Sequence, residues 1–205
     1  DEPIPFFGEL GAINPVFVFP AAQAARGSDL GTAWAGSLTM GVGQFCTNPG
    51  VVILQEGDGA EALVSAAEKA LSEVAAQPML TDGVAQGYRS GVARVAGSDA
   101  VRTHLRTAAE GRQGGPALFE VSGADWRAHP ELAEEVFGPA GIVVRATDAD
   151  EALAIARALQ GQLTATLHME AEDTAAARAL LPILERKAGR VLVNGFPTGV
   201  EVAEA

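Results

Sequence analysis

Residues 41–50 read GVGQFCTNPG and contain Cys46, the single cysteine among the 205 residues of the chain. They separate an apolar segment rich in helix formers, 30–40, from a continuous apolar segment, 51–54, that is typical of a buried strand. Glycine allows backbone torsions that a Cβ forbids, so such a turn can hold a side chain in a defined, exposed place. A lone cysteine is more often a small buried apolar residue. The choice between the two interpretations therefore depends on the rest of the sequence.

Strand-like and helix-like segments alternate along the chain. The pattern predicts strands over residues 16–19, 51–55, 117–121, 141–145, 163–168 and 190–193. It predicts helices over residues 21–40, 60–76, 98–110, 149–160 and 171–187. Asp58 and Asp148 are expected N-caps, and Thr81 or Asp82 is expected to cap a helix that runs toward Ala96. Such alternation is typical of βαβ units, so we expect one α/β domain whose mostly parallel sheet is covered by helices on both faces.

The composition argues against several classes of protein. A net charge of −12 disfavours a nucleic-acid surface, because phosphate binding needs clustered Lys and Arg. One cysteine excludes an internal disulfide framework and a cysteine-based zinc site, and three scattered histidines predict no metal site. No apolar run reaches the roughly 18 residues of a membrane span, and we expect no signal peptide before the fold. We expect a cytoplasmic protein that binds neither membranes nor nucleic acid.

Three short motifs give the cysteine a specific context. Residues 43–46, GQFC, followed by Gly50, resemble the cysteine motif of the NAD(P)-dependent aldehyde dehydrogenases, G-Q-x-C with a short turn and a glycine. Residues 9–11, ELG, match the start of that family's general-base motif, and residues 134–139, EEVFGP, match its E-E-[IV]-F-G-P motif. The motifs occur in the family's order across most of the chain. One departure is that Ala12 and Ile13 replace the usual Gly and Lys, which fits a subgroup difference.

The resemblance implies a role for each motif. Cys46 is the implied nucleophile and Glu9 the implied general base, because a thiolate adds readily to a carbonyl and a carboxylate can activate water. Glu135 is implied to bind the ribose beside the nicotinamide of NADP or NAD, and Phe137 to position the nicotinamide ring. Phe45, next to the nucleophile, is a candidate for lining the substrate pocket. Without the adjoining Phe-Gly-Pro, the acidic pair at 134–135 would be more typical of a solvated surface.

The resemblance also implies that residues 1–205 are a catalytic domain only. Family members are about twice as long, with an N-terminal cofactor-binding half and a C-terminal oligomerisation strand that have no counterpart here. The full-length protein is therefore expected to be a homo-oligomer that takes a small aldehyde, and the fragment alone is expected to be inactive. An isolated, non-catalytic interaction module is the alternative from a different class.

The sequence around the motifs indicates which aldehyde is the substrate. Residues 3–17, 43–50 and 193–200 look like the 2,5-dioxopentanoate (α-ketoglutarate semialdehyde) dehydrogenase subgroup. That likeness implies oxidation of 2,5-dioxopentanoate to 2-oxoglutarate, usually with NADP. Succinate semialdehyde or a fatty aldehyde are the alternative substrates.

Overall fold

The computed structural model describes residues 11–197 and contains a seven-stranded sheet. Its strand order is β4-β6-β7-β2-β1-β8-β9, and every neighbouring pair is parallel except β4 and β6. The bounds are β1 (Val16–Val18), β2 (Val51–Gln55), β4 (Arg102–Arg106), β6 (Ala117–Ser122), β7 (Ala140–Ala146), β8 (Gln162–His168) and β9 (Ala188–Val193). A separate antiparallel pair joins β3 (Gln77–Pro78) and β5 (Gln113–Gly114). The prediction of a mostly parallel sheet is confirmed.

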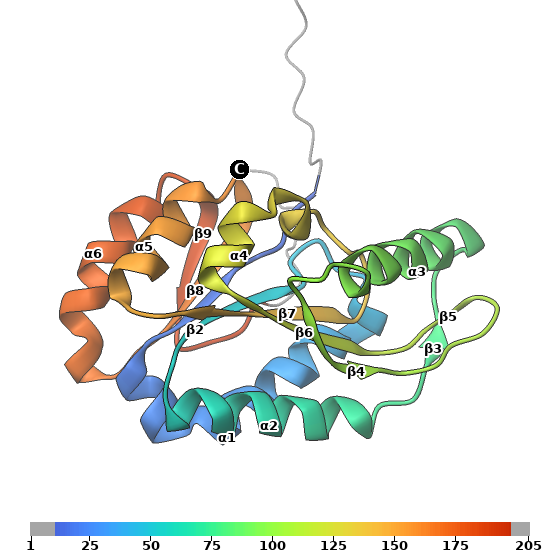
Figure 1. Cartoon of the computed structure of the whole chain (residues 1–205), viewed down its shortest axis with the longest axis horizontal. Helices are drawn as coiled ribbons and strands as arrows, with labels where there is room; N and C mark the ends of the chain where they lie inside the picture. The colour runs from blue at the N-terminus through green and yellow to red at the C-terminus, as the bar shows by residue number, and fades with distance from the viewer. Residues whose placement is uncertain (1–10, 198–205) are drawn as a thin grey trace, which may run out of the picture.

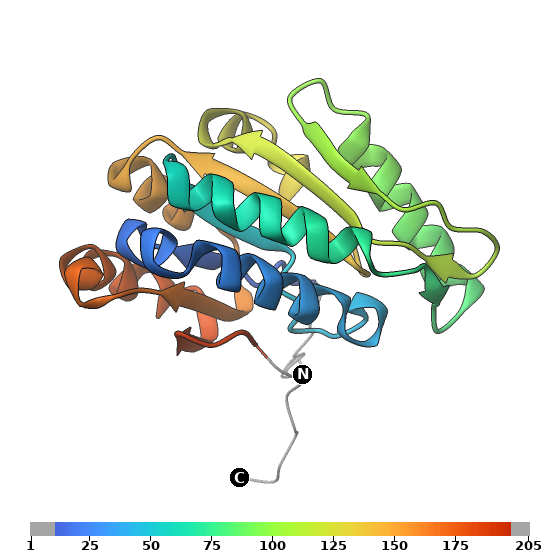
Figure 2. The same cartoon turned by 90° about the horizontal axis from the view of Figure 1, so that it is seen from below.

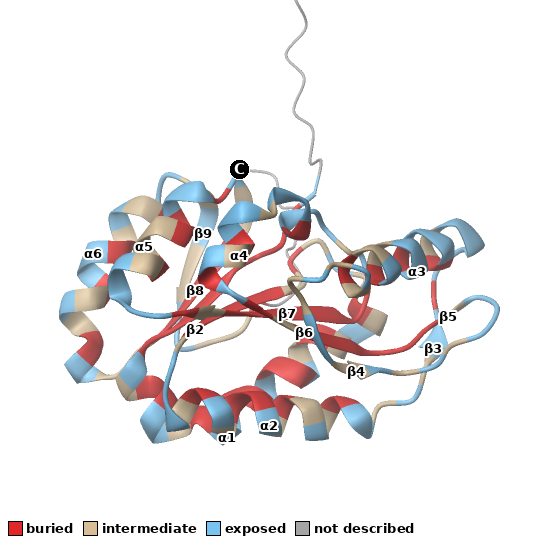
Figure 3. Cartoon of the chain, viewed as in Figure 1, coloured by how far each residue is buried: buried red, intermediate tan, exposed pale blue. Residues whose placement is uncertain are grey.

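Helices cover both faces of this sheet, as Figure 1 shows. The face toward the lower edge of that view carries α1 (Pro20–Thr39) and α2 (Asp58–Ser72). The opposite face carries α3 (Asp82–Ala96), α4 (Gly123–Ala128), α5 (Ala149–Ala158) and α6 (Thr174–Leu184). Short 3-10 turns are η1 (Met40–Gly43), η2 (Pro130–Ala133) and η3 (Ala171–Asp173). Two apolar cores lie between the layers, and the central strands are accordingly buried (Figure 3).

The layer made by α1 and α2 is unusually tight. The two helices lie side by side along the sheet (Figure 2). A Cβ at Gly31 would lie 2.1 Å from the carbonyl oxygen of Leu63, and one at Gly27 would lie 2.4 Å from that of Gly59. The two backbones are therefore in contact, which only glycine permits at these positions. This packing fixes the orientation of α1, and therefore the place at which the cysteine loop begins.

Local signals predict most helix starts correctly. Thr81 accepts a hydrogen bond from the N–H of Val84 at 3.2 Å, and Asp148 accepts one from the N–H of Glu151 at 2.8 Å, so both predicted caps are confirmed. The prediction for Asp58 is wrong, because Gly57 is the N-cap and Asp58 is already the first helical residue. The last two helices also end earlier than predicted, at residues 158 and 184.

The prediction of a helix over residues 98–110 is wrong. Residues 102–106 form β4, which pairs antiparallel with β6 and covers that edge of the sheet. The register shifts between Thr103 and Leu105, as at a bulge. Pairing with the open edge of β6 satisfies the backbone groups of this segment, and this tertiary interaction overrides its local helix preference.

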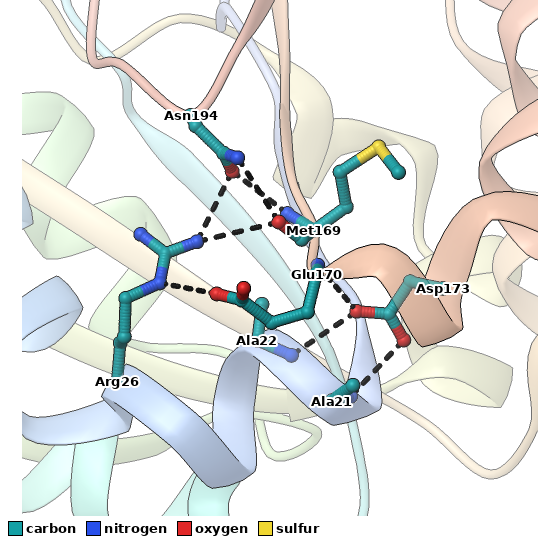
Figure 4. A network of polar contacts seen from close by, with 7 residues as sticks. All are labelled: Ala21, Ala22, Arg26, Met169, Glu170, Asp173 and Asn194. Carbon is teal, nitrogen blue, oxygen red and sulfur yellow. Dashed lines mark hydrogen bonds and ion pairs between the residues drawn. The ribbon is translucent and has the colours of Figure 1, made fainter.

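A polar network at the carboxyl edge of the sheet fixes the start of α1 (Figure 4). The N-cap of α1 is Phe19, which has no side-chain acceptor. The buried carboxylate of Asp173, in η3, accepts from the N–H groups of Ala21 and Ala22 at 3.0 and 3.1 Å. Arg26 pairs with Glu170 at 2.6 Å (Nε to Oε1). A carboxylate at a helix N-terminus satisfies unpaired N–H groups and opposes the helix dipole, so this network anchors α1 to the segment after β8.

His168, at the end of β8, gives a pH-dependent prediction. Its ring is 1% exposed and lies 4.6 Å from that of Phe196, centroid to centroid. Neither ring nitrogen has a hydrogen-bond partner among residues 11–197. Burial, and then the charge of Arg26, lower the pKa of His168 from 6.5 to about 4. Between pH 6.5 and 4, His168 is protonated in the unfolded chain but neutral in the folded protein. The free energy of unfolding is therefore at its full value above pH 6.5 and falls as the pH drops toward 4.

The expected loss of unfolding free energy from this histidine is about 3 kcal/mol across that window. Urea unfolding at pH 7.5, 6, 5 and 4 measures it, with His168→Leu expected to flatten the dependence. His129→Gln, at an exposed histidine, is the control and should keep the wild-type slope. Parallel pH dependences for wild type and His168→Leu would contradict this account of the buried ring.

Candidate active site

The described residues of the three motif segments lie at the amino edge of neighbouring strands. Residues 11–15 precede β1, residues 41–50 precede β2, and residues 134–139 precede β7. β2 lies between β1 and β7 and is parallel to both, so the three entry loops share one edge. The N–H of Gly50 donates to the carbonyl oxygen of Ile13 at 3.0 Å. A cavity between the loops is lined by residues from all three of them.

The cysteine loop begins with an uncommon backbone path. Gly41, Val42 and Gly43 have φ values of +54°, +59° and +65°, all in the left-handed region. This region is unfavourable for a β-branched residue such as Val42 and persists only where the surroundings impose it. The path turns the chain sharply from the end of α1 into the Cys46 segment.

Hydrogen bonds made by Asn48, within the loop, and by Trp34, in α1, hold the chain in that path. The side-chain amide of Asn48 donates to the carbonyl oxygens of Leu38 and Gly43 at 3.1 and 2.8 Å. The indole N–H of the fully buried Trp34 donates to the carbonyl oxygen of Pro49 at 2.8 Å. These bonds tie the C-terminal end of the loop to α1 and to Gly43 at the start of the loop, which gives Cys46 a rigid support.

The cysteine loop and the EEVFGP segment are packed backbone against backbone. A Cβ at Gly43 would lie 2.3 Å from the carbonyl carbon of Gly138 and 2.5 Å from the nitrogen of Pro139. Gly138, with φ of +153°, lies in turn against the ring of Tyr88. Burial raises the pKa of Tyr88, whose hydroxyl donates to the carbonyl oxygen of Gly115 at 2.6 Å. A rigid stack therefore links two motifs that are about ninety residues apart in the sequence.

The structure places four of the five predicted site residues at this edge. Cys46 is half-buried, and Phe45 is 38% exposed with its ring over Gly41. Glu135 and Phe137 are exposed and line the cavity, whereas Cys46 and Phe45 do not. Glu9 lies outside the described residues. The roles of all five stay predictions, but the cysteine loop and the two cofactor candidates share one edge of the sheet.

The two neighbouring glutamates differ in their surroundings. Glu134 is 65% exposed in its side chain and pairs with Arg94 at 3.4 Å, a solvated ion pair that contributes little to stability. The carboxylate of Glu135 faces the segment before β1, because a Cβ at Gly11 would lie 3.1 Å from its Oε2. Glu135 thus projects into the space between two motif segments, and Glu134 points to solvent.

Asn14 is a residue of this site that the sequence motifs did not indicate. Its side chain is 1% exposed and donates to the carbonyl oxygens of Cys46 and Asn48 at 2.9 and 3.0 Å. Its φ is +46°, a conformation that asparagine tolerates better than most residues. The Asn-Pro dipeptide is a signal for a turn here, and nothing nearby in sequence indicates which carbonyls the amide would reach.

No group of three or more His, Cys, Asp and Glu side chains within residues 11–197 is placed to hold a metal ion. None of the helices in the same range combines the length and apolar character that crossing a bilayer requires.

Comparison with known proteins identifies the relatives of this arrangement. The model of the "Aldehyde dehydrogenase family" matches residues 4–204. The chain is 50% identical over 206 residues to "Alpha-ketoglutaric semialdehyde dehydrogenase 2" of Azospirillum brasilense. It is 38% identical over 211 residues to "Alpha-ketoglutaric semialdehyde dehydrogenase" of Acinetobacter baylyi. Both matches cover 100% of this chain but only 39% of the relative, so the chain spans well under half the length of these proteins.

A solved structure shows the same fold. It is a point mutant of betaine aldehyde dehydrogenase from Staphylococcus aureus in complex with NAD+. The TM-score is 0.73 at 18% identity, and the match covers 93% of this chain and 40% of that one. At this identity the likeness concerns the fold alone, and it confirms the predicted fold class.

Proposed function

The chain belongs to the aldehyde dehydrogenase family, and from this we propose that residues 1–205 are the catalytic domain of an NAD(P)-dependent aldehyde dehydrogenase with Cys46 as its nucleophile. The observation that carries the proposal is the packing of the Cys46 loop on the EEVFGP segment at one edge of the sheet. That packing supports a site in which the nucleophile and the cofactor-binding residues lie on adjoining segments.

The residues present fit a nicotinamide cofactor. Glu135 offers an exposed carboxylate that can accept hydrogen bonds from ribose hydroxyls, and Phe137 offers an exposed aromatic ring beside it. When bound there, NAD or NADP would supply the acceptor for the hydride of the aldehyde carbon. A complex of a structural neighbour with NAD+ supports a nicotinamide cofactor, and the choice between NAD and NADP rests on the sequence resemblance.

Cys46 supplies the covalent chemistry in this proposal. Its thiolate adds to the aldehyde carbon, forming the S–C bond of a thiohemiacetal and leaving negative charge on the former carbonyl oxygen. The backbone N–H of Cys46 is a candidate donor to that oxygen. Loss of hydride leaves a thioester, which a water attacks while Glu9 takes its proton. The products are a carboxylic acid and the regenerated Cys46 thiolate.

The proposed substrate is 2,5-dioxopentanoate, oxidised to 2-oxoglutarate. Two relatives that are 50% and 38% identical over the whole chain carry the name alpha-ketoglutaric semialdehyde dehydrogenase, which supports this choice. We propose that the full-length protein is a cytoplasmic homo-oligomer. Since the chain spans 39% of these relatives, residues 1–205 alone are proposed to show little turnover.

A panel of aldehydes tests the proposal. Formation of reduced cofactor by the full-length protein is measured with 2,5-dioxopentanoate, succinate semialdehyde and a long-chain aldehyde, each with NAD and with NADP. We expect kcat/KM for 2,5-dioxopentanoate to exceed the others by about tenfold or more, equivalent to about 1.4 kcal/mol in transition-state binding. A preference for another aldehyde would overturn the substrate, and no activity with any aldehyde would overturn the function.

A further inference from the structure

We propose that Asn14 is a positioning residue that fixes the Cys46 loop through its side-chain amide. The inference rests on the proposed function, because it concerns the same nucleophile. Asn14 lies immediately before Pro15 and β1, outside the loop that it contacts. It acts on Cys46 through the main chain and makes no contact of its own with a substrate in this account.

Both polar atoms of the Asn14 side-chain amide are hydrogen-bonded. Nδ2 donates to the carbonyl oxygens of Cys46 and Asn48 at 2.9 and 3.0 Å. Oδ1 accepts from the N–H and the hydroxyl of Thr164 at 3.1 and 3.0 Å. A flipped amide would place an oxygen against two carbonyl oxygens, so the partners define its orientation. Only an amide supplies two donors and an acceptor at one buried point, and Asn14 is 1% exposed.

The main chain of Asn14 is fixed from the opposite side. The N–H groups of Ile13 and Asn14 both donate to Oε1 of Gln162, at 2.8 and 2.9 Å. Gln162 and Thr164 both belong to β8, which neighbours β1 on the side away from β2. A continuous set of hydrogen bonds therefore runs from β8 through Asn14 to the carbonyl of Cys46. It defines the peptide plane that follows the cysteine and thereby the direction of its side chain.

This support matters because the loop starts in a strained conformation. Val42 has φ of +59°, an unfavourable torsion for a β-branched residue. The loop can relax this strain if the hydrogen bonds from Asn14 to Cys46 and Asn48 are removed. The side-chain amide of Asn48 donates to the carbonyl oxygen of Gly43, at the start of the loop. The amide of Asn14 donates to the carbonyl oxygen of Cys46 itself. Release should leave the half-buried thiol more accessible to a small reagent yet badly placed for an aldehyde. The proposal therefore predicts opposite changes in two measurable rates.

The test uses Asn14→Gly in the full-length protein. Glycine keeps the left-handed torsion available and removes the side chain with its amide. We expect alkylation of Cys46 by iodoacetamide at pH 7.5 to become about three- to tenfold faster. We expect kcat for the aldehyde to fall about tenfold or more, with KM changed by less than about twofold. Asn14→Asp, which keeps the shape but removes both donors, should change both rates at least as much.

Asn194→Gly is the matched control. Asn194 is also left-handed, with φ of +56°, and its amide is likewise hydrogen-bonded, to Met169 and Arg26 at the opposite edge of the sheet. This variant should lose stability but keep the wild-type alkylation rate and kcat. Equal changes in both asparagine variants, or unchanged rates in Asn14→Gly, would overturn the positioning role.

Two further arms keep the test decisive. If Asn14→Gly does not fold, Thr164→Val removes one donor to the amide and should shift both rates in the same directions by less. No shift in that variant would contradict the proposal. If the wild-type protein oxidises no aldehyde, the alkylation rates still report on the loop, so failure of the proposed function is distinguished from failure of this inference.

Discussion

Replacement of Cys46 by alanine in the full-length protein is expected to lower kcat for aldehyde oxidation by more than about 1,000-fold. The methyl group of alanine cannot form the S–C bond on which hydride loss depends. Binding of NAD or NADP should change by less than about twofold, because the cofactor candidates Glu135 and Phe137 lie on another segment. Steady-state formation of reduced cofactor measures the first effect, and fluorescence titration of the reduced cofactor measures the second.

Phe45→Leu is the matched control for that experiment. It changes the neighbouring side chain, which is 38% exposed, and leaves the thiol in place. If Phe45 lines the substrate pocket as predicted, this variant should raise KM for the aldehyde while keeping most of kcat. Normal turnover by Cys46→Ala would remove Cys46 from the reaction and with it the proposed mechanism.

Gly43→Ala is expected to have the largest effect on stability. The added Cβ would lie 2.3 Å from the carbonyl carbon of Gly138, at a residue whose φ is +65°. Gly138 cannot retreat, since it lies against the ring of Tyr88. We expect a loss of about 3 kcal/mol or more in unfolding free energy and a fall of about 100-fold in kcat. Urea unfolding and steady-state kinetics measure the two effects.

Gly36→Ala gives the opposite expectation. Gly36 is exposed in the interior of α1, and a Cβ added there would meet nothing within 4 Å beyond its chain neighbours and the nearby helix backbone. Alanine there should stabilise the protein by up to about 1 kcal/mol, because it lowers the entropy of the unfolded chain and favours helix. If both alanine variants behaved alike, the close contact between the two motif loops would not be important for this fold.

Local patterns predicted the elements whose signals are local. The strand over 51–55 has the predicted bounds, because a continuous apolar run between turn residues defines it. The cap at Asp148 was equally predictable, since its partner lies three residues away. The strand at 102–106 was not, because its stability comes from pairing with β6, and only the assembled sheet offers that edge.

The site divides in the same way. The motifs identified Cys46, Glu135 and Phe137 by resemblance, whereas their meeting at one edge follows from the strand order. Asn14 could not be predicted, because its amide joins groups 32, 34 and 150 residues away in sequence. The contact between Gly43 and Gly138 is equally non-local. Sequence thus indicates the chemistry of the site, and the fold determines what holds it in place.

The proposed mechanism requires that Sγ of Cys46 bonds to the aldehyde carbon during turnover. The full-length Glu9→Gln variant is mixed with 2,5-dioxopentanoate and NADP and quenched in acid. The mass of the proteolytic peptide that contains Cys46 is then measured by mass spectrometry. Because the variant lacks the proposed base for hydrolysis, we expect a 2-oxoglutaryl thioester on that peptide and a single burst of reduced cofactor. An unmodified Cys46 peptide, recovered after reduced cofactor has formed, would contradict this mechanism.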